Sequence, residues 1–213
     1  MQAEMSSDTV DTSPPVRGRR FLVVYATRHG STKGVAEAIA KELSAAGQEV
    51  DVRPASEMSE PSRYDAVVVG GPMIRGWHKD ALRFVVKHRV ELAARPTTFF
   101  ITAASLTETG EDEVKGVPIV KDPWLAKRPR NNAKLGRKER YALPSHYLGD
   151  ILAKVAPLRP RLAAFFAGSL DLTTMGFLDK LFVLLVVGAA PGDGRNWQAI
   201  REWARALPTS MID

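Results

Sequence analysis

The hydrophobic pattern of residues 21–43 predicts a buried strand that leads directly into a helix. Residues 21–25 are apolar without a break, which is typical of a strand buried on both faces. Val35, Ile39 and Leu43 then recur at helical spacing, with charged residues on the other faces. The short stretch between the two elements is rich in hydroxyl groups, and it is therefore the first candidate for a functional loop.

The rest of the chain repeats this alternation of apolar runs and amphipathic periods. Four more strands are predicted, at residues 49–53, 64–70, 97–103 and 162–168. Helices are predicted at residues 79–94, 146–155, 175–187 and 196–207. This alternation is typical of a parallel α/β sheet, and right-handed crossovers leave few ways to wind it. Gly70-Gly71-Pro72 predicts a turn that ends the third strand.

Two stretches lack such a period. Residues 1–18 are mostly polar residues and proline, and we predict a disordered tail without a secretory signal. Residues 104–144 form an insert that is dense in Lys, Arg, Pro and Asn. A loop of this length usually serves a function or is disordered. Residues 19–213 are predicted to form one domain that contains this insert.

Composition narrows the classes of function. The chain has no cysteine, which excludes disulfides, thiol catalysis and cysteine-ligated clusters. Its four histidines show no close grouping with carboxylates, so no metal site is expected. The longest apolar run, residues 181–190, is shorter than a membrane span. A net charge of +6 points to an anionic partner.

The loop after the first strand has the features of a phosphate site. The first N–H groups of a helix lack partners and carry the positive end of its dipole, which favours an anion. Gly30 allows the backbone to approach a phosphate closely. The alternative is an ordinary strand-turn-helix whose hydroxyls cap the helix. The candidate residues are Thr27, Arg28, His29, Gly30, Ser31 and Thr32.

The pattern Thr27-x-x-Gly30-x-Thr32 after a first buried strand resembles the FMN phosphate loop of the flavodoxin superfamily. This resemblance implies FMN as the cofactor. It also implies a flavodoxin-like three-layer α/β sandwich with a five-stranded parallel sheet of order 2-1-3-4-5 and a long insert after strand four. The basic net charge departs from flavodoxin electron carriers, which are strongly acidic, and this departure argues against a shuttle role.

The resemblance implies two further flavin-facing segments at the same edge of the sheet. The segment after the third strand comprises Pro72, Met73, Ile74, Arg75, Gly76 and Trp77. The segment after the fourth strand comprises Thr102, Ala103, Ala104 and Ser105. Trp77 either stacks on the flavin or packs against the neighbouring helix, and His78 either begins that helix or exchanges protons near the flavin.

A narrower resemblance, to the menaquinone-dependent protoporphyrinogen oxidase family, rests on several stretches. These are the insert and residues 25–30, 64–70, 84–88 and 167–170. It implies oxidation of protoporphyrinogen IX to protoporphyrin IX through FMN, with a quinone as acceptor, in heme biosynthesis. It names no catalytic side chain. Basic and aromatic residues suited to a porphyrinogen with anionic propionates are Arg75, Trp124, Lys127, Arg128 and Arg130.

Two other classes of function stay open. One is an FMN electron carrier or a general quinone reductase, and the other is a cofactor-free interaction module on the same fold. We expect a cytoplasmic protein without a nucleic-acid partner. Peripheral contact with the inner face of the cell membrane, through the basic surface and residues 177–187, is the alternative to a core role for that helix. The sequence leaves the oligomeric state open.

Overall fold

The computed structural model describes residues 18–74, 76–131, 133–170 and 192–211. Residues 1–17 of the predicted tail, Arg75 and the predicted helix at 175–187 lie outside the described residues. The core elements, in chain order, are β1 (Arg20–Tyr25), α1 (Ser31–Ala45), β2 (Glu49–Pro54), the 3₁₀ turn η1 (Pro61–Arg63), β3 (Ala66–Met73), α2 (Lys79–Lys87), α3 (Arg89–Ala93), β4 (Thr97–Ala103), α5 (Pro144–Val155), β9 (Leu162–Ala167) and α7 (Trp197–Ser210).

The central sheet confirms the predicted α/β class and extends it. Its strand order is β2-β1-β3-β4-β9-β7-β6. The first five strands are parallel neighbours in the predicted order 2-1-3-4-5. Two further strands from the insert, β7 (Val117–Lys121) and β6 (Glu113–Val114), continue the sheet beyond β9, so the predicted count of five strands is too low.

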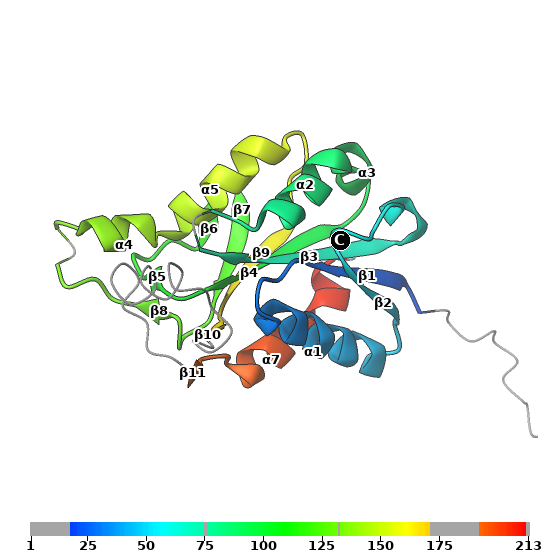
Figure 1. Ribbon diagram of the computed structural model, residues 1–213, viewed down its shortest axis with the longest axis horizontal. Helices are drawn as coiled ribbons and strands as arrows, with labels where there is room; N and C mark the ends of the chain where they lie inside the picture. The colour runs from blue at the N-terminus through cyan, green and yellow to red at the C-terminus, as the bar shows by residue number, and fades with distance from the viewer. Residues whose placement is uncertain (1–17, 75, 132, 171–191, 212–213) are drawn as a thin grey trace, which may run out of the picture.

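Alternating side chains on the strands divide the core between two faces of the sheet. Phe21 and Val23 of β1 pack with α1 and α7, whereas Leu22 and Val24 pack on the face covered by α2 and α5. Figure 1 shows these two helical layers on opposite sides of the sheet. Anything bound at the start of α1 and anything bound between α2 and α5 therefore approach the sheet from opposite faces.

Two predicted boundaries are wrong. Gly70-Gly71-Pro72 does not end the third strand, because β3 continues to Met73 in register with β4. A Cβ at position 70 would lie 1.8 Å from the ring of Phe100, so this glycine provides room for an aromatic ring and not a turn. The predicted helix at 79–94 is broken at His88 into α2 and α3.

The insert is not a structureless loop. Besides β6 and β7 it contains β5 (Leu106–Thr107) paired with β8 (Ala126–Lys127), and the short helix α4 (Arg137–Tyr141). The Lys121 ammonium joins its early part to β7 by donating to Glu108 Oε1 (2.9 Å) and to the carbonyl of Glu111 (2.7 Å). The insert is thus anchored to the sheet edge next to β9.

Candidate functional site

The phosphate-loop candidate begins α1 with the geometry that its sequence predicts. Gly30 is the N-cap and adopts the left-handed conformation (φ 83°), which a residue with a Cβ rarely adopts. Among the described residues, no side chain caps this helix end, and no acidic residue lies in its first turn. The first-turn N–H groups and the positive end of the dipole therefore face the loop without a competing carboxylate.

The hydroxyls of Ser31 and Thr32 differ in their surroundings. Ser31 Oγ accepts a hydrogen bond from the backbone N–H of Ser169 (2.8 Å), which leaves its own proton available to donate. Thr32 is 1% exposed, and its hydroxyl lies 3.0 Å from that of Thr102. Ser31 is therefore placed for ligand contact, while Thr32 joins the loop to the end of β4.

The loop fits a phosphate group. His29 Nε2 is buried and has no hydrogen-bond partner among the described residues. An unpaired buried polar atom costs about 1–3 kcal/mol, and a polar ligand in the loop relieves that cost. Thr27 is half-buried beside it, whereas Arg28 is exposed. Together with the uncapped helix start, these features match the dianion of a nucleotide phosphate.

Four strand ends meet at this edge of the sheet. The backbone N–H of Ala26 donates to the carbonyl of Gly70 (2.8 Å), which joins the loop after β1 to β3. The Thr32–Thr102 contact joins α1 to β4, and the N–H of Gly168 donates to the carbonyl of Ala103 (3.1 Å). The structure thus brings together the segments that the sequence places at the flavin.

The described residues of the second segment, 72–74 and 76–77, continue from β3 and contact Tyr141 of the insert. Pro72 and Met73 are the last residues of β3, and Gly76 has a positive φ of 106°. The carbonyl of Ile74 accepts a hydrogen bond from the Tyr141 hydroxyl (3.2 Å).

Trp77 packs in the core. It is 7% exposed, its Nε1 donates to the carbonyl of Gly71 (3.2 Å), and its ring centroid lies 5.1 Å from that of Phe99. The structure thus buries Trp77 against the sheet, on the face covered by α2 and α5.

The third segment joins the insert to α5. Thr102 and Ala103 are buried at the end of β4, while Ala104 and Ser105 are half-buried. The side chain of Ser105 is hydrogen-bonded to the phenol of Tyr147 on α5. Burial, with a smaller effect of Tyr141, raises the pKa of Tyr147 to about 12 although the bond to Ser105 acts in the opposite direction. The phenol is therefore neutral at physiological pH.

His78 begins α2, as one of its two interpretations predicts. Its Nδ1 accepts a hydrogen bond from the backbone N–H of Asp80 (3.3 Å). Burial lowers the pKa of His78, and the positive charges of Arg28 and Lys79 lower it further, against the opposing effect of Asp80. The neutral ring is the form that accepts the capping bond.

Four of the five residues predicted to contact a porphyrinogen lie on the surface of the insert, and the fifth, Arg75, lies outside the described residues. Trp124 is 66% exposed, and Lys127, Arg128 and Arg130 are exposed as well. The backbone N–H of Arg130 donates to Glu139 Oε1 (2.9 Å), and this bond joins the chain at Arg130 to α4. These four side chains are basic or aromatic, and each of them is exposed.

Sequence reasoning missed Ser169, which follows β9, Arg195, which precedes α7, and Asp122, which lies just after β7 and contacts both regions. Ser169 donates its N–H to Ser31, and Arg195 donates through Nη1 to the Ser31 carbonyl (3.4 Å). Asp122, 1% exposed, accepts hydrogen bonds from Trp124 N (2.9 Å), Ala167 N (3.2 Å) and Asn196 Nδ2 (2.9 Å). The available signal was the small pair Gly168-Ser169 directly after a buried strand, the same pattern as at the other strand ends.

In the described part of residues 18–211, neither a metal-binding cluster nor a membrane-spanning helix occurs. No group of three or more His, Asp or Glu in that part of the chain has the arrangement of a metal site. None of its helices has the length and apolar character needed to cross a bilayer.

Comparison with known proteins agrees with this geometry. The sequence profile described as a flavodoxin domain matches residues 22–195. Protoporphyrinogen IX dehydrogenase (quinone) of Escherichia coli strain K12 is 34% identical over 199 residues, covering 88% of this chain and 94% of the relative. The enzyme of the same name from Escherichia coli O157:H7 has the same identity and coverage.

Solved flavodoxins are more distant. Flavodoxin 2 from Bacillus cereus is 15% identical, with 89% of this chain and 98% of the other covered and a TM-score of 0.47. A flavodoxin from the domain Archaea is 12% identical, with coverages of 91% and 99% and a TM-score of 0.46. Because the family profile spans most of the chain and the curated relatives exceed 30% identity, the chain belongs to the flavodoxin family, with FMN as its cofactor, as a relative of the protoporphyrinogen IX dehydrogenases.

Proposed function

We propose that this oxidoreductase oxidises protoporphyrinogen IX to protoporphyrin IX and passes the electrons to a quinone. The observation that carries the proposal is the 34% identity to protoporphyrinogen IX dehydrogenase (quinone), which extends over 94% of that relative. A match that covers nearly the whole relative favours the same reaction more than a shared fold alone does. The hydrogen bonds that join the loops after β1, β3 and β4 support a cofactor site at this edge of the sheet.

The chemistry that bound FMN supplies is two-electron transfer. Conversion of one porphyrinogen to porphyrin removes six electrons and six protons, and three quinones take them up to become three quinols. The balance needs no other oxidant. The protein has to hold the phosphate, position the ring and admit the two organic substrates.

Named residues fit these tasks. Ser31 and the first-turn N–H groups of α1 hold the phosphate. The backbone at Ile74 and the small residues Ala103 and Ala104 offer a surface that a flat ring can approach closely. Lys127, Arg128 and Arg130, all exposed on the insert, supply positive charge for two propionates, with Trp124 as the aromatic neighbour. In this proposal the insert attracts the porphyrinogen and the strand ends present the flavin to it.

The test is an anaerobic assay of the FMN-loaded protein with protoporphyrinogen IX and menadione, followed by porphyrin fluorescence. We expect porphyrin formation above the rate without enzyme, dependent on both FMN and menadione.

The double variant with Arg128→Glu and Arg130→Glu should raise the KM for porphyrinogen. The matched double variant with Lys41→Glu and Lys87→Glu, exposed on α1 and α2, should leave this KM unchanged. Fast reduction of menadione by a nicotinamide cofactor without any porphyrin would assign a general quinone reductase instead.

A further inference from the structure

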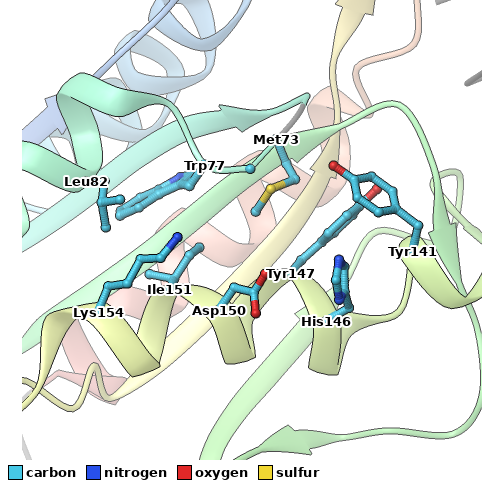
Figure 2. A pocket seen from close by; sticks show the side chains of 10 residues that line it. Met73, Trp77, Leu82, Tyr141, His146, Tyr147, Asp150, Ile151 and Lys154 are labelled. Carbon is cyan, nitrogen blue, oxygen red and sulfur yellow. The ribbon is translucent and has the colours of Figure 1, made fainter.

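A pocket of about 230 Å³ opens on the face of the sheet opposite α1, between the second flavin-facing segment and α5. Figure 2 shows Trp77 and Leu82 at one end, Tyr141 and His146 at the other, and Met73 between them. Its floor is apolar and aromatic, with Met73, Trp77, Tyr147 and Ile151 all less than 10% exposed.

One stripe of α5 supplies the polar rim. His146, Asp150 and Lys154 are spaced four residues apart, so they lie on one side of the helix, and all three are exposed. His146 and Lys154 are N–H donors, and Asp150 is an acceptor. The rim therefore carries both signs of charge above an apolar floor, an arrangement that suits a neutral ligand with polar atoms at its edge.

The pocket is joined to both flavin-facing segments by tyrosines. Tyr141 donates to the carbonyl of Ile74 (3.2 Å), and Tyr147 is hydrogen-bonded to Ser105. The rings of Tyr141 and Tyr147 pack edge to face with their centroids 5.6 Å apart, and the ring centroid of His146 lies 5.1 Å from that of Tyr141. A ligand in the pocket thus contacts the groups that fix the segments expected to hold the isoalloxazine.

We propose that this pocket binds the ring of the quinone acceptor, an inference that rests on the proposed function. The volume lies below the roughly 300–1,000 Å³ of sites that enclose larger ligands, so it suits one or two fused rings and not a tetrapyrrole. Asp150 repels the propionates of a porphyrinogen but not a neutral quinone. His146 and Lys154 donate to quinone carbonyls, and Asp150 accepts from the hydroxyls of the quinol product.

Direct binding tests the assignment without turnover. Menadione is titrated into the oxidised, FMN-loaded protein by calorimetry, with variants Lys154→Ala, His146→Ala and Leu82→Trp. Lys154 and His146 are exposed and Leu82 is half-buried, so these changes spare the deep core. We expect the two alanine variants to weaken menadione binding roughly tenfold, about 1.4 kcal/mol, and Leu82→Trp to abolish it by filling the pocket. Lys41→Ala, on α1, is the matched control and should bind like the unchanged protein.

Kinetics then separate this proposal from the one on which it rests. The rim variants should raise KM for menadione while leaving KM for porphyrinogen and the affinity for FMN unchanged. Menadione binding that is the same in all variants overturns the quinone assignment. A rise in the KM for porphyrinogen alone also overturns the quinone assignment, because it assigns the pocket to the tetrapyrrole. A loss of FMN affinity overturns it as well, because it assigns the pocket to the flavin ring. Absence of porphyrin formation by the unchanged protein contradicts the proposed function, whereas pocket-dependent menadione binding stands independently of it.

Discussion

At the scale of the residue, we propose two functions for Ser31 at the start of α1. Its oxygen accepts the N–H of Ser169 (2.8 Å), and its proton is free to donate to a phosphate. Ser31→Ala removes both bonds. Because a hydrogen bond to a charged group contributes about 1.5–3 kcal/mol, we expect the Kd for FMN to rise at least about tenfold in a flavin-fluorescence titration. Ser44→Ala, exposed on the same helix, is the control, and equal Kd values for the two variants would contradict this role.

The raised pKa of Tyr147 predicts that the folded protein loses stability at alkaline pH. Its pKa is raised from 10.0 to about 12 in the folded protein, mainly by burial. Below about pH 10 the phenol is neutral in both states, and its neutral form contributes full stability. Between about pH 10 and pH 12 the unfolded phenol ionises first, so stability is lost, by up to about 3 kcal/mol.

Urea unfolding at about pH 9 and about pH 12 measures this loss. The unchanged protein should lose more stability over that range than Tyr147→Phe, which has no ionisable group at the position. Loss of the bond to Ser105 lowers the stability of the variant equally at both pH values, so it does not affect the difference. Equal losses of stability in the unchanged protein and in Tyr147→Phe would show that the Tyr147 phenol is not the titrating group.

Residue roles at the strand ends could be predicted only in part. Gly30 was expected to let the backbone approach a phosphate, and the structure shows that it is the left-handed N-cap of α1. Thr32 was expected to face a phosphate, but its hydroxyl is buried against Thr102, seventy residues away along the chain. Local spacing does not reveal such a partner. The roles of Ser169 and Arg195 were missed for the same reason.

At the scale of the element, Asp122 connects three parts of the fold. It lies just after β7 and accepts hydrogen bonds from the N–H groups of Trp124 and Ala167 and from the side chain of Asn196, which caps α7. Asp122→Ala leaves these donors unpaired in a buried site. We expect a loss of about 3 kcal/mol or more in urea unfolding, because each unsatisfied buried donor costs about 1–3 kcal/mol.

The isosteric Asp122→Asn provides the comparison. This variant keeps one acceptor oxygen and the packing volume, so its loss of stability in urea unfolding should be clearly smaller than that of the alanine variant. If the two variants are equally stable, the hydrogen bonds of Asp122 do not hold the insert, β9 and α7 together.

Elements with a strong local pattern were predictable, and those that depend on distant partners were not. β1, α1 and β4 show continuous apolar runs or a clear helical period, and the structure confirms them. β7 has five residues, includes Pro118 and buries alternate positions only because β9 lies beside it. In β3, Gly70 signals a turn locally but is required by the ring of Phe100 on the adjacent strand, and a Cβ at Gly71 would lie 2.9 Å from Nε1 of Trp77.

At the scale of the whole molecule, the positive charge is concentrated in part on the insert. The chain carries a net charge of +6, and the exposed insert residues Lys127, Arg128 and Arg130 lie near Trp124, which is 66% exposed. An exposed tryptophan among cations suits the interface of an anionic membrane. A membrane is also the place where a lipid quinone is found. We therefore predict binding to vesicles that contain anionic lipid, at low salt and with Trp124 and the insert toward the surface.

Co-sedimentation with anionic vesicles tests this orientation. Each Lys or Arg near the surface contributes about 1 kcal/mol, so removing the two charges with Arg128→Ala and Arg130→Ala should weaken binding about 30-fold. Lys41→Ala with Lys87→Ala removes the same net charge from α1 and α2 and should have a smaller effect. High salt should release the unchanged protein, because screening shortens the range of the attraction. If the two pairs of substitutions weaken vesicle binding equally, the attraction depends on net charge alone and not on the insert. If the unchanged protein does not bind the vesicles at low salt, the predicted membrane contact is wrong.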